Sequence, residues 1–119
     1  MKKITVILAL LMASMAFGQL SPLAQAYKNQ QPERYECFKK FAEKDWSGDH
    51  VMIVYVINNQ VEAYNEFLTY RDELPDTQKY MNILTHALKD WSENAELCTT
   101  NWEMVVYQVK NQLEALESY

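Results

Sequence analysis

Two cysteines, Cys37 and Cys98, carry the most reactive side-chain chemistry in this chain of 119 residues. A nucleophilic cysteine needs a reduced thiol with a base placed beside it. The chain has no C-x-x-C motif, and its first residues have the pattern of an export signal, which leads to an oxidising compartment. We therefore predict one structural disulfide between Cys37 and Cys98 and no catalytic cysteine.

His86 and Asp90 are four residues apart, a spacing at which two side chains on one helix can share a metal ion. The second histidine, His50, lies at the start of another predicted helix and does not extend this pair. Residues 45–49 faintly resemble a calcium loop, but the twelfth position would be Val56 instead of a glutamate. The sequence therefore predicts no metal site and no cofactor.

Paired carboxylates occur at Glu62 and Glu66, and again at Asp72, Glu73 and Asp76. Glycosidase-type catalysis needs two carboxyl groups that face each other across a cleft, whereas these lie on one helix face or at one helix end. The chain also lacks the G-x-S-x-G, P-loop and dinucleotide-binding motifs. We predict that the protein is not an enzyme and that these acids are solvated.

Five large side chains lie outside the best apolar stripes. They stand beside a stripe, at a helix end, or in a stretch that is apolar on all sides. They are Trp46, Val51, Tyr55, Tyr70 and Tyr107, and we call them the predicted binding set. Exposed apolar patches mark sites for partners or ligands, so we predict that this set contacts a partner. The alternative is that the helix over residues 50–74 is the most buried one and that its apolar residues are core.

The element that must position these residues is a long apolar stripe in the C-terminal half. Its members follow one another at gaps of three or four residues with a mean period of 3.6, the repeat of one face of an α-helix. The stripe consists of Tyr80, Leu84, Ala87, Trp91, Ala95, Cys98, Trp102, Val105, Val109, Leu113 and Leu116.

We predict helices over Pro32 to about Lys44, over residues 50–74 and over Thr77 to about Cys98, with a fourth helix after a break at residues 99–101. Residues 51–57 also fit a buried strand, but the chain offers that strand no good partner. An unbroken helix through the break is the alternative for the C-terminal half. The predicted fold class is all-α, a small antiparallel bundle of three to four helices with one disulfide.

The chain opens like a cleaved signal peptide. Two lysines precede an uncharged stretch, residues 4–17, which is too short to span a bilayer that needs about 20 residues. We place the cut after Ala26, so that residues 27–119 form a single helical domain, and a cut after Gly18 is the alternative. The protein is then exported without a membrane anchor, periplasmic if the source is bacterial and otherwise extracellular.

Without this leader the chain keeps nine basic and sixteen acidic residues, a net charge of −7. Such a chain argues against nucleic acid and anionic membranes and mildly favours a basic protein as partner. We predict a binding protein that acts by contact with another exported or periplasmic protein, without catalysis. The expected role is that of an inhibitor, an immunity-type protein or a stress chaperone. In layout only, as a short helical chain with one disulfide between distant helices, the chain is similar to the small periplasmic acid-stress chaperones.

Two other classes stay open. The first is a carrier that holds a small apolar ligand between its helices, with aromatic side chains lining the pocket. The second is a secreted effector or structural protein, if the leader is cut after Gly18.

Overall fold

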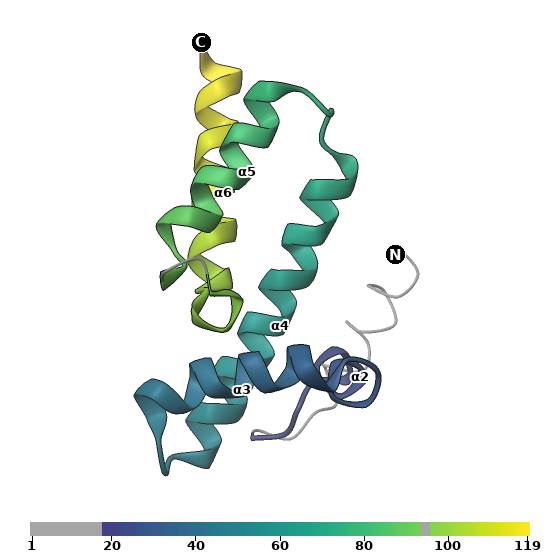
Figure 1. Cartoon of the computed structure of the whole chain (residues 1–119), viewed down its shortest axis with the longest axis vertical. Helices are drawn as coiled ribbons and strands as arrows, with labels where there is room; N and C mark the ends of the chain where they lie inside the picture. Colours follow the sequence, from purple (N-terminus) through teal and green to yellow (C-terminus); the bar gives the residue numbers. More distant parts are fainter. Residues whose placement is uncertain (1–17, 94–95) are drawn as a thin grey trace. The chain divides into compact units, whose positions relative to one another are not determined.

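The structure is a computed structural model, and it describes residues 18–93 and 96–119. These residues form helices and connecting turns without a strand among them (Figure 1). In chain order the elements are α2 (Pro22–Gln30), α3 (Pro32–Trp46), α4 (His50–Glu73), α5 (Gln78–Asp90), the 3-10 helix η2 (Leu97–Thr99) and α6 (Trp102–Ser118). The all-α fold class is confirmed, but the described chain holds five α-helices, so the predicted count of three to four was wrong.

Helix α2 is the one that the sequence reading missed. Ser21 caps it, because its Oγ accepts a hydrogen bond from the backbone N–H of Ala24 at 3.0 Å. Pro22 takes the first helical position, where its missing N–H costs nothing. Ala24 and Tyr27 are buried, and the helix continues to Gln30.

Residues 51–57 belong to helix α4 and not to a strand, as predicted. Asp49 stabilises the start of the helix, because its Oδ1 accepts a hydrogen bond from a backbone N–H three residues further on, at 3.1 Å. Ile53, Ile57 and Val61 are buried and stand four residues apart. This spacing lets one face of a helix pack into the core while every backbone N–H within the helix finds a partner.

The break predicted at residues 99–101 is present, but the helix before it ends earlier than expected. Helix α5 stops at Asp90 and does not reach Cys98. The hydroxyl groups of Ser92 and Thr100 lie 2.7 Å apart and share a hydrogen bond across the turn. Short hydroxyl side chains that bond locally compete with helical hydrogen bonds, which accounts for the early end.

Local hydrogen bonds also close this turn and start the last helix. Thr99 Oγ1 accepts a hydrogen bond from the backbone N–H of Glu93 at 2.8 Å. Asn101 caps α6, since its Oδ1 accepts a hydrogen bond from the backbone N–H of Met104 at 3.3 Å.

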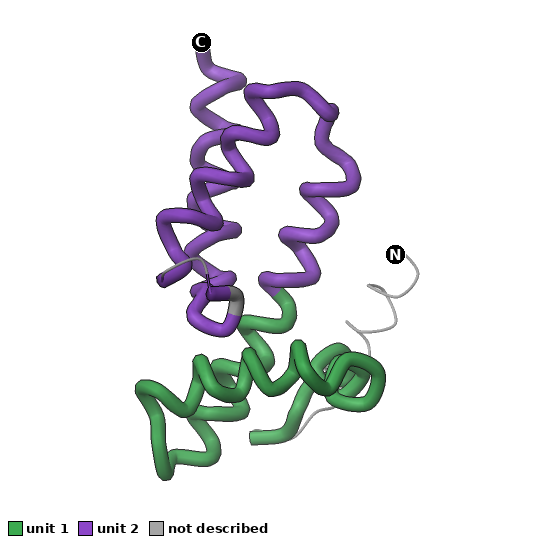
Figure 2. The backbone as a smooth tube through the Cα atoms, in the orientation of Figure 1, with its two compact units in different colours: residues 1–62 green, residues 63–119 purple. Residues whose placement is uncertain are grey.

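The chain divides into two compact units, residues 1–62 and residues 63–119 (Figure 2). We call them unit 1 and unit 2. Helix α4 passes through the boundary, so its first part belongs to unit 1 and its last part to unit 2. The sequence predicts a single domain over residues 27–119.

The core of unit 1 is built on α2, α3 and the first part of α4. The rings of Tyr27 and Phe38 meet edge to face, with centroids 5.8 Å apart and planes at 87°. Other enclosed positions of this unit, each no more than 2% exposed, are Ala24, Ala42, Ile57, Gln60 and Val61.

The core of unit 2 is centred on Trp102 at the start of α6. Its ring lies 4.7 Å from the ring of Tyr64 and 5.4 Å from that of Phe67, measured between centroids. Helices α5 and α6 run antiparallel beside each other (Figure 1) and bury the middle of the predicted stripe. The buried stripe residues are Leu84, Ala87, Trp102, Val105 and Val109.

The predicted disulfide is confirmed, and it joins Cys37 on α3 to Cys98 in η2. Neither cysteine is free. The bond closes a loop of about 60 residues. It is a long-range covalent link, and such a link restricts the conformations of the unfolded chain.

Candidate functional site

Three members of the predicted binding set lie on the two sides of one tight turn in unit 1. Trp46 ends α3, and its carbonyl oxygen accepts a hydrogen bond from the backbone N–H of Asp49 at 2.9 Å. Val51 and Tyr55 follow on the first turns of α4, four residues apart and therefore on one face. We call Trp46, Val51 and Tyr55 the corner patch. Their exposed fractions are 41%, 44% and 51%.

The turn within the corner patch has a backbone that suits only a few residue types. Gly48 has a φ of +87°, in the left-handed region that other residues enter at a cost. This glycine allows α3 to end and α4 to begin within three residues. The turn residues Ser47, Gly48 and Asp49 therefore bring Trp46 close to the start of α4.

Acidic residues are the neighbours of the corner patch in the sequence. Glu43, Asp45 and Asp49 are exposed, and Lys44 is the one lysine or arginine among residues 43–51. Apolar residues with a charged rim are the usual anatomy of a surface that binds another protein. The sign of this rim suits a partner with basic groups around an apolar centre.

The other two members of the predicted binding set lie in unit 2. Tyr107 on α6 is 61% exposed, whereas Tyr70 near the end of α4 is partly buried. The prediction that all five bind a partner remains a prediction. The structure groups only the three residues of the corner patch around one turn.

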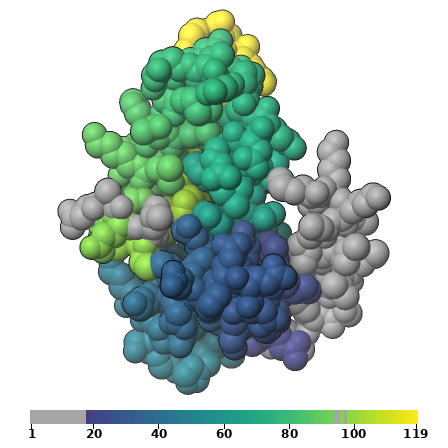
Figure 3. All heavy atoms as spheres, turned by 45° about the vertical axis from the view of Figure 1, so that its right-hand side comes forward, coloured from purple at the N-terminus to yellow at the C-terminus, as the bar shows by residue number. Residues whose placement is uncertain are grey.

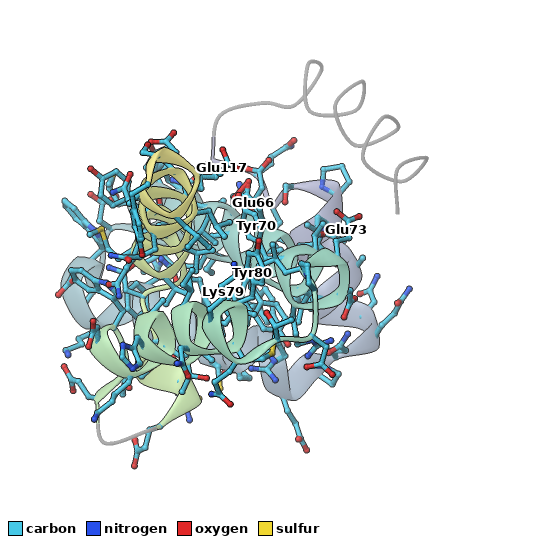
Figure 4. The ribbon with its side chains drawn as sticks, turned by 90° about the horizontal axis from the view of Figure 1, so that it is seen from above. Glu66, Tyr70, Glu73, Lys79, Tyr80 and Glu117 are labelled. Atoms are coloured by element: carbon cyan, nitrogen blue, oxygen red, sulfur yellow. The ribbon has the colours of Figure 1, made fainter. Side chains whose placement is uncertain are left out.

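Tyr70 belongs to a small polar cluster with Glu66 and Lys110. Lys110 Nζ lies 3.2 Å from Glu66 Oε1, which joins α6 to α4 within unit 2. Burial raises the pKa of Tyr70 above 10.0, Glu66 raises it further, and Lys110 lowers it. Figure 4 shows Glu66 and Tyr70 of α4 close together. A phenol with a raised pKa stays protonated at neutral pH, and the ion pair beside it ties α6 to α4 within unit 2.

The stability of the protein should fall at alkaline pH, and buried tyrosines should account for part of the fall. Burial also raises the pKa of Tyr35, and Glu36 and Glu43 add to this effect. Each tyrosine ionises at a lower pH in the unfolded chain than in the folded one. Its contribution to the free energy of unfolding is therefore complete below pH 10.0 and is lost as the pH rises through the higher folded pKa.

Urea unfolding measured on both sides of pH 10.0 tests this expectation. Tyr35→Phe and Tyr70→Phe should each flatten the alkaline decline, and the double variant should show the flattest curve. An unchanged decline in the double variant would contradict the assignment.

A polar groove of about 350 Å³ lies between α5 and α6 in unit 2. Its lining residues are Asn82, Ile83, His86, Asp90, Gln108 and Gln112. Gln108 is held firmly, since its Oε1 accepts a hydrogen bond from Trp91 Nε1 at 2.7 Å and its Nε2 donates one to Asp90 Oδ2 at 3.0 Å. This chain of bonds was not evident from the sequence, because it joins two helices through a side-chain amide.

His86 and Asp90 do reach one groove, as their spacing suggested. However, no group of three metal-ligating His, Cys, Asp or Glu side chains occurs in the described part of the chain. Most metal sites in proteins draw on at least three protein ligands. Within the described residues His86 and Asp90 are thus two polar side chains of the groove and not part of such a group of three.

Comparisons with known protein families, curated proteins and solved structures found no match to this chain. Among residues 18–93 and 96–119, no helix has both the length and the apolar character that crossing a membrane requires.

Proposed function

We propose that this chain is an exported helical protein that binds another protein through the corner patch and performs no catalysis. The observation that carries the proposal is the exposure of Trp46, Val51 and Tyr55 around one turn. Tryptophan and tyrosine are the residues most often responsible for binding energy at protein interfaces. An inhibitor, an immunity-type protein and a stress chaperone would all use such a surface.

The partner that fits this surface is a basic protein with an apolar contact site. The chain without its leader has a net charge of −7, and the rim of the corner patch is acidic. Opposite charges around an apolar centre raise the rate of association and select between partners. Binding should therefore weaken as the salt concentration rises. Figure 3 shows that α3 and the first part of α4 contribute to the surface of unit 1.

A carrier of a small apolar ligand is the alternative function. The groove between α5 and α6 gives it little support, because five of its six lining side chains are polar. Apolar ligands bind in pockets lined mainly by hydrophobic and aromatic side chains.

The proposal predicts that two substitutions in the corner patch abolish partner capture. Trp46→Ala with Tyr55→Ala should weaken binding by at least about 30-fold, because truncating an interface aromatic typically costs about 2 kcal/mol or more. Both side chains are about half exposed and neither belongs to the buried core, so the variant should keep its fold. The measurement is affinity capture from the exported fraction with wild-type and variant baits, followed by mass spectrometry.

Tyr119→Ala is the matched control, because Tyr119 is 95% exposed and follows the last residue of α6, outside the corner patch. Basic proteins held by the wild-type and Tyr119→Ala baits, but not by the double variant, would support the proposal. The same captured proteins on all three baits would contradict it, and so would a capture of lipid with no protein.

A further inference from the structure

The first described residues are fastened to α4 by one side chain. Asn58 Oδ1 accepts a hydrogen bond from the backbone N–H of Ser21 at 2.8 Å. Asn58 Nδ2 donates a hydrogen bond to the backbone carbonyl oxygen of Gln19 at 2.9 Å. Both polar ends of one amide thus hold the three residues that lead into α2.

Ser21 and the first part of α2 belong to the core of unit 1. Ser21 is 5% exposed, Ala24 is fully buried and Tyr27 is 7% exposed. A cut after Ala26 would break α2 between its fifth and sixth residues. It would also remove the Ser21 cap, the buried Ala24 and both hydrogen bonds to Asn58. A cut after Gly18 removes none of them.

We propose that the exported chain is cleaved after Gly18 and that the new first residue, Gln19, closes to pyroglutamate. The proposal rests on export, which is part of the proposed function, but it requires no binding partner. Gly18 is the small residue before the cut, and it is exposed with a φ of +88°. The other small residue that signal peptidase would read, Ala16, lies outside the described residues.

Cyclisation needs only atoms that Gln19 already carries. The α-amino nitrogen attacks Cδ of the side-chain amide, a new N–Cδ bond forms, and the Cδ–Nε2 bond breaks. The departing nitrogen takes a proton from the attacking amine and leaves as ammonia, without oxidation or reduction. Gln19 is exposed, and its carbonyl oxygen, which binds Asn58, is not altered by ring closure.

The position of Gln19 makes this modification favourable for the fold. Helix α2 begins at Pro22, so a free α-ammonium group at Gln19 would lie close to the positive end of the helix dipole. The pyroglutamate ring is neutral and removes this repulsion. It also denies aminopeptidases a free N-terminus just before a segment that the core requires.

The test is to produce the full chain with its own leader in an exporting bacterium and to recover the exported protein. After reduction, intact mass and fragmentation of the N-terminal peptide should show a chain that begins at residue 19 and is lighter than the unmodified chain by one ammonia. Gln19→Ala is the matched control, which should give the same cut, no loss of ammonia and an N-terminal amine that labels with amine reagents.

An N-terminus at Tyr27 or a retained leader would overturn the cleavage site and, with it, the modification. A chain that begins at Gln19 with a free amine would overturn the cyclisation. These results are read from mass alone, so they are independent of whether the corner patch captures a partner.

Discussion

Trp102→Ala should lower the free energy of unfolding by about 3–5 kcal/mol, the usual cost of truncating a buried tryptophan. Trp102 is 3% exposed and contacts the rings of Tyr64 and Phe67. The substitution deletes both ring contacts and leaves a cavity that neighbouring helices cannot fully fill. Since small domains have a net stability of about 5–15 kcal/mol, this single change removes a large share of it.

Urea unfolding followed by circular dichroism provides the measurement. Trp46→Ala is the matched control, because it deletes the same side chain from a position that is 41% exposed, and it should cost less than about 1 kcal/mol. If Trp102→Ala does not fold, Trp102→Phe should fold with an intermediate stability. Equal losses for Trp102→Ala and Trp46→Ala would show that the core of unit 2 is not centred on Trp102.

Removing the disulfide is expected to have an effect of similar size. In the chain-entropy model, closing a loop of about 60 residues stabilises the folded state by roughly 4 kcal/mol. The variant Cys37→Ala/Cys98→Ala should therefore unfold at a markedly lower urea concentration than the oxidised wild type. The reason is that the unfolded chain gains conformational entropy when residues 37 and 98 are no longer joined.

The reduced wild-type protein is the control for this experiment. If the bond acts mainly on the unfolded chain, the reduced protein and the double alanine variant should have similar stabilities, both far below that of the oxidised protein. Oxidised and reduced proteins of equal stability would contradict the role assigned to the bond. Thiol titration of the native exported protein should find no free thiol, in agreement with the structure.

Much of the helical layout could be predicted because its signals are local. Leu84 and Ala87 lie on one face of α5 and Val105 and Val109 on one face of α6. Pro32 marks the start of α3 by its own covalent geometry. The break after α5 was also predictable from weak helix formers. That α5 ends at Asp90 was not predictable, because the end of the helix depends on a hydrogen bond between the hydroxyl groups of Ser92 and Thr100 across the turn.

The candidate site was partly predictable for the same reason. Helical stripes show which positions cannot face a core, and Trp46, Val51 and Tyr55 are indeed exposed. The same stripes do not show how much of a side chain a neighbouring helix covers. Tyr70 is partly buried beside Glu66 and Lys110, a fact that depends on how α6 packs against the end of α4 within unit 2.

The sequence by itself determined the helical character of this protein, its acidic charge and the identity of its two disulfide partners. Each follows from composition, from the count of cysteines, or from contacts within one or two helical turns. Only the tertiary structure decided that α2 is part of the fold, because its place depends on Asn58, which lies 37 residues beyond Ser21. Hydrogen bonds and burial between distant segments have no periodic signature in a chain, so they become visible only after the chain has folded.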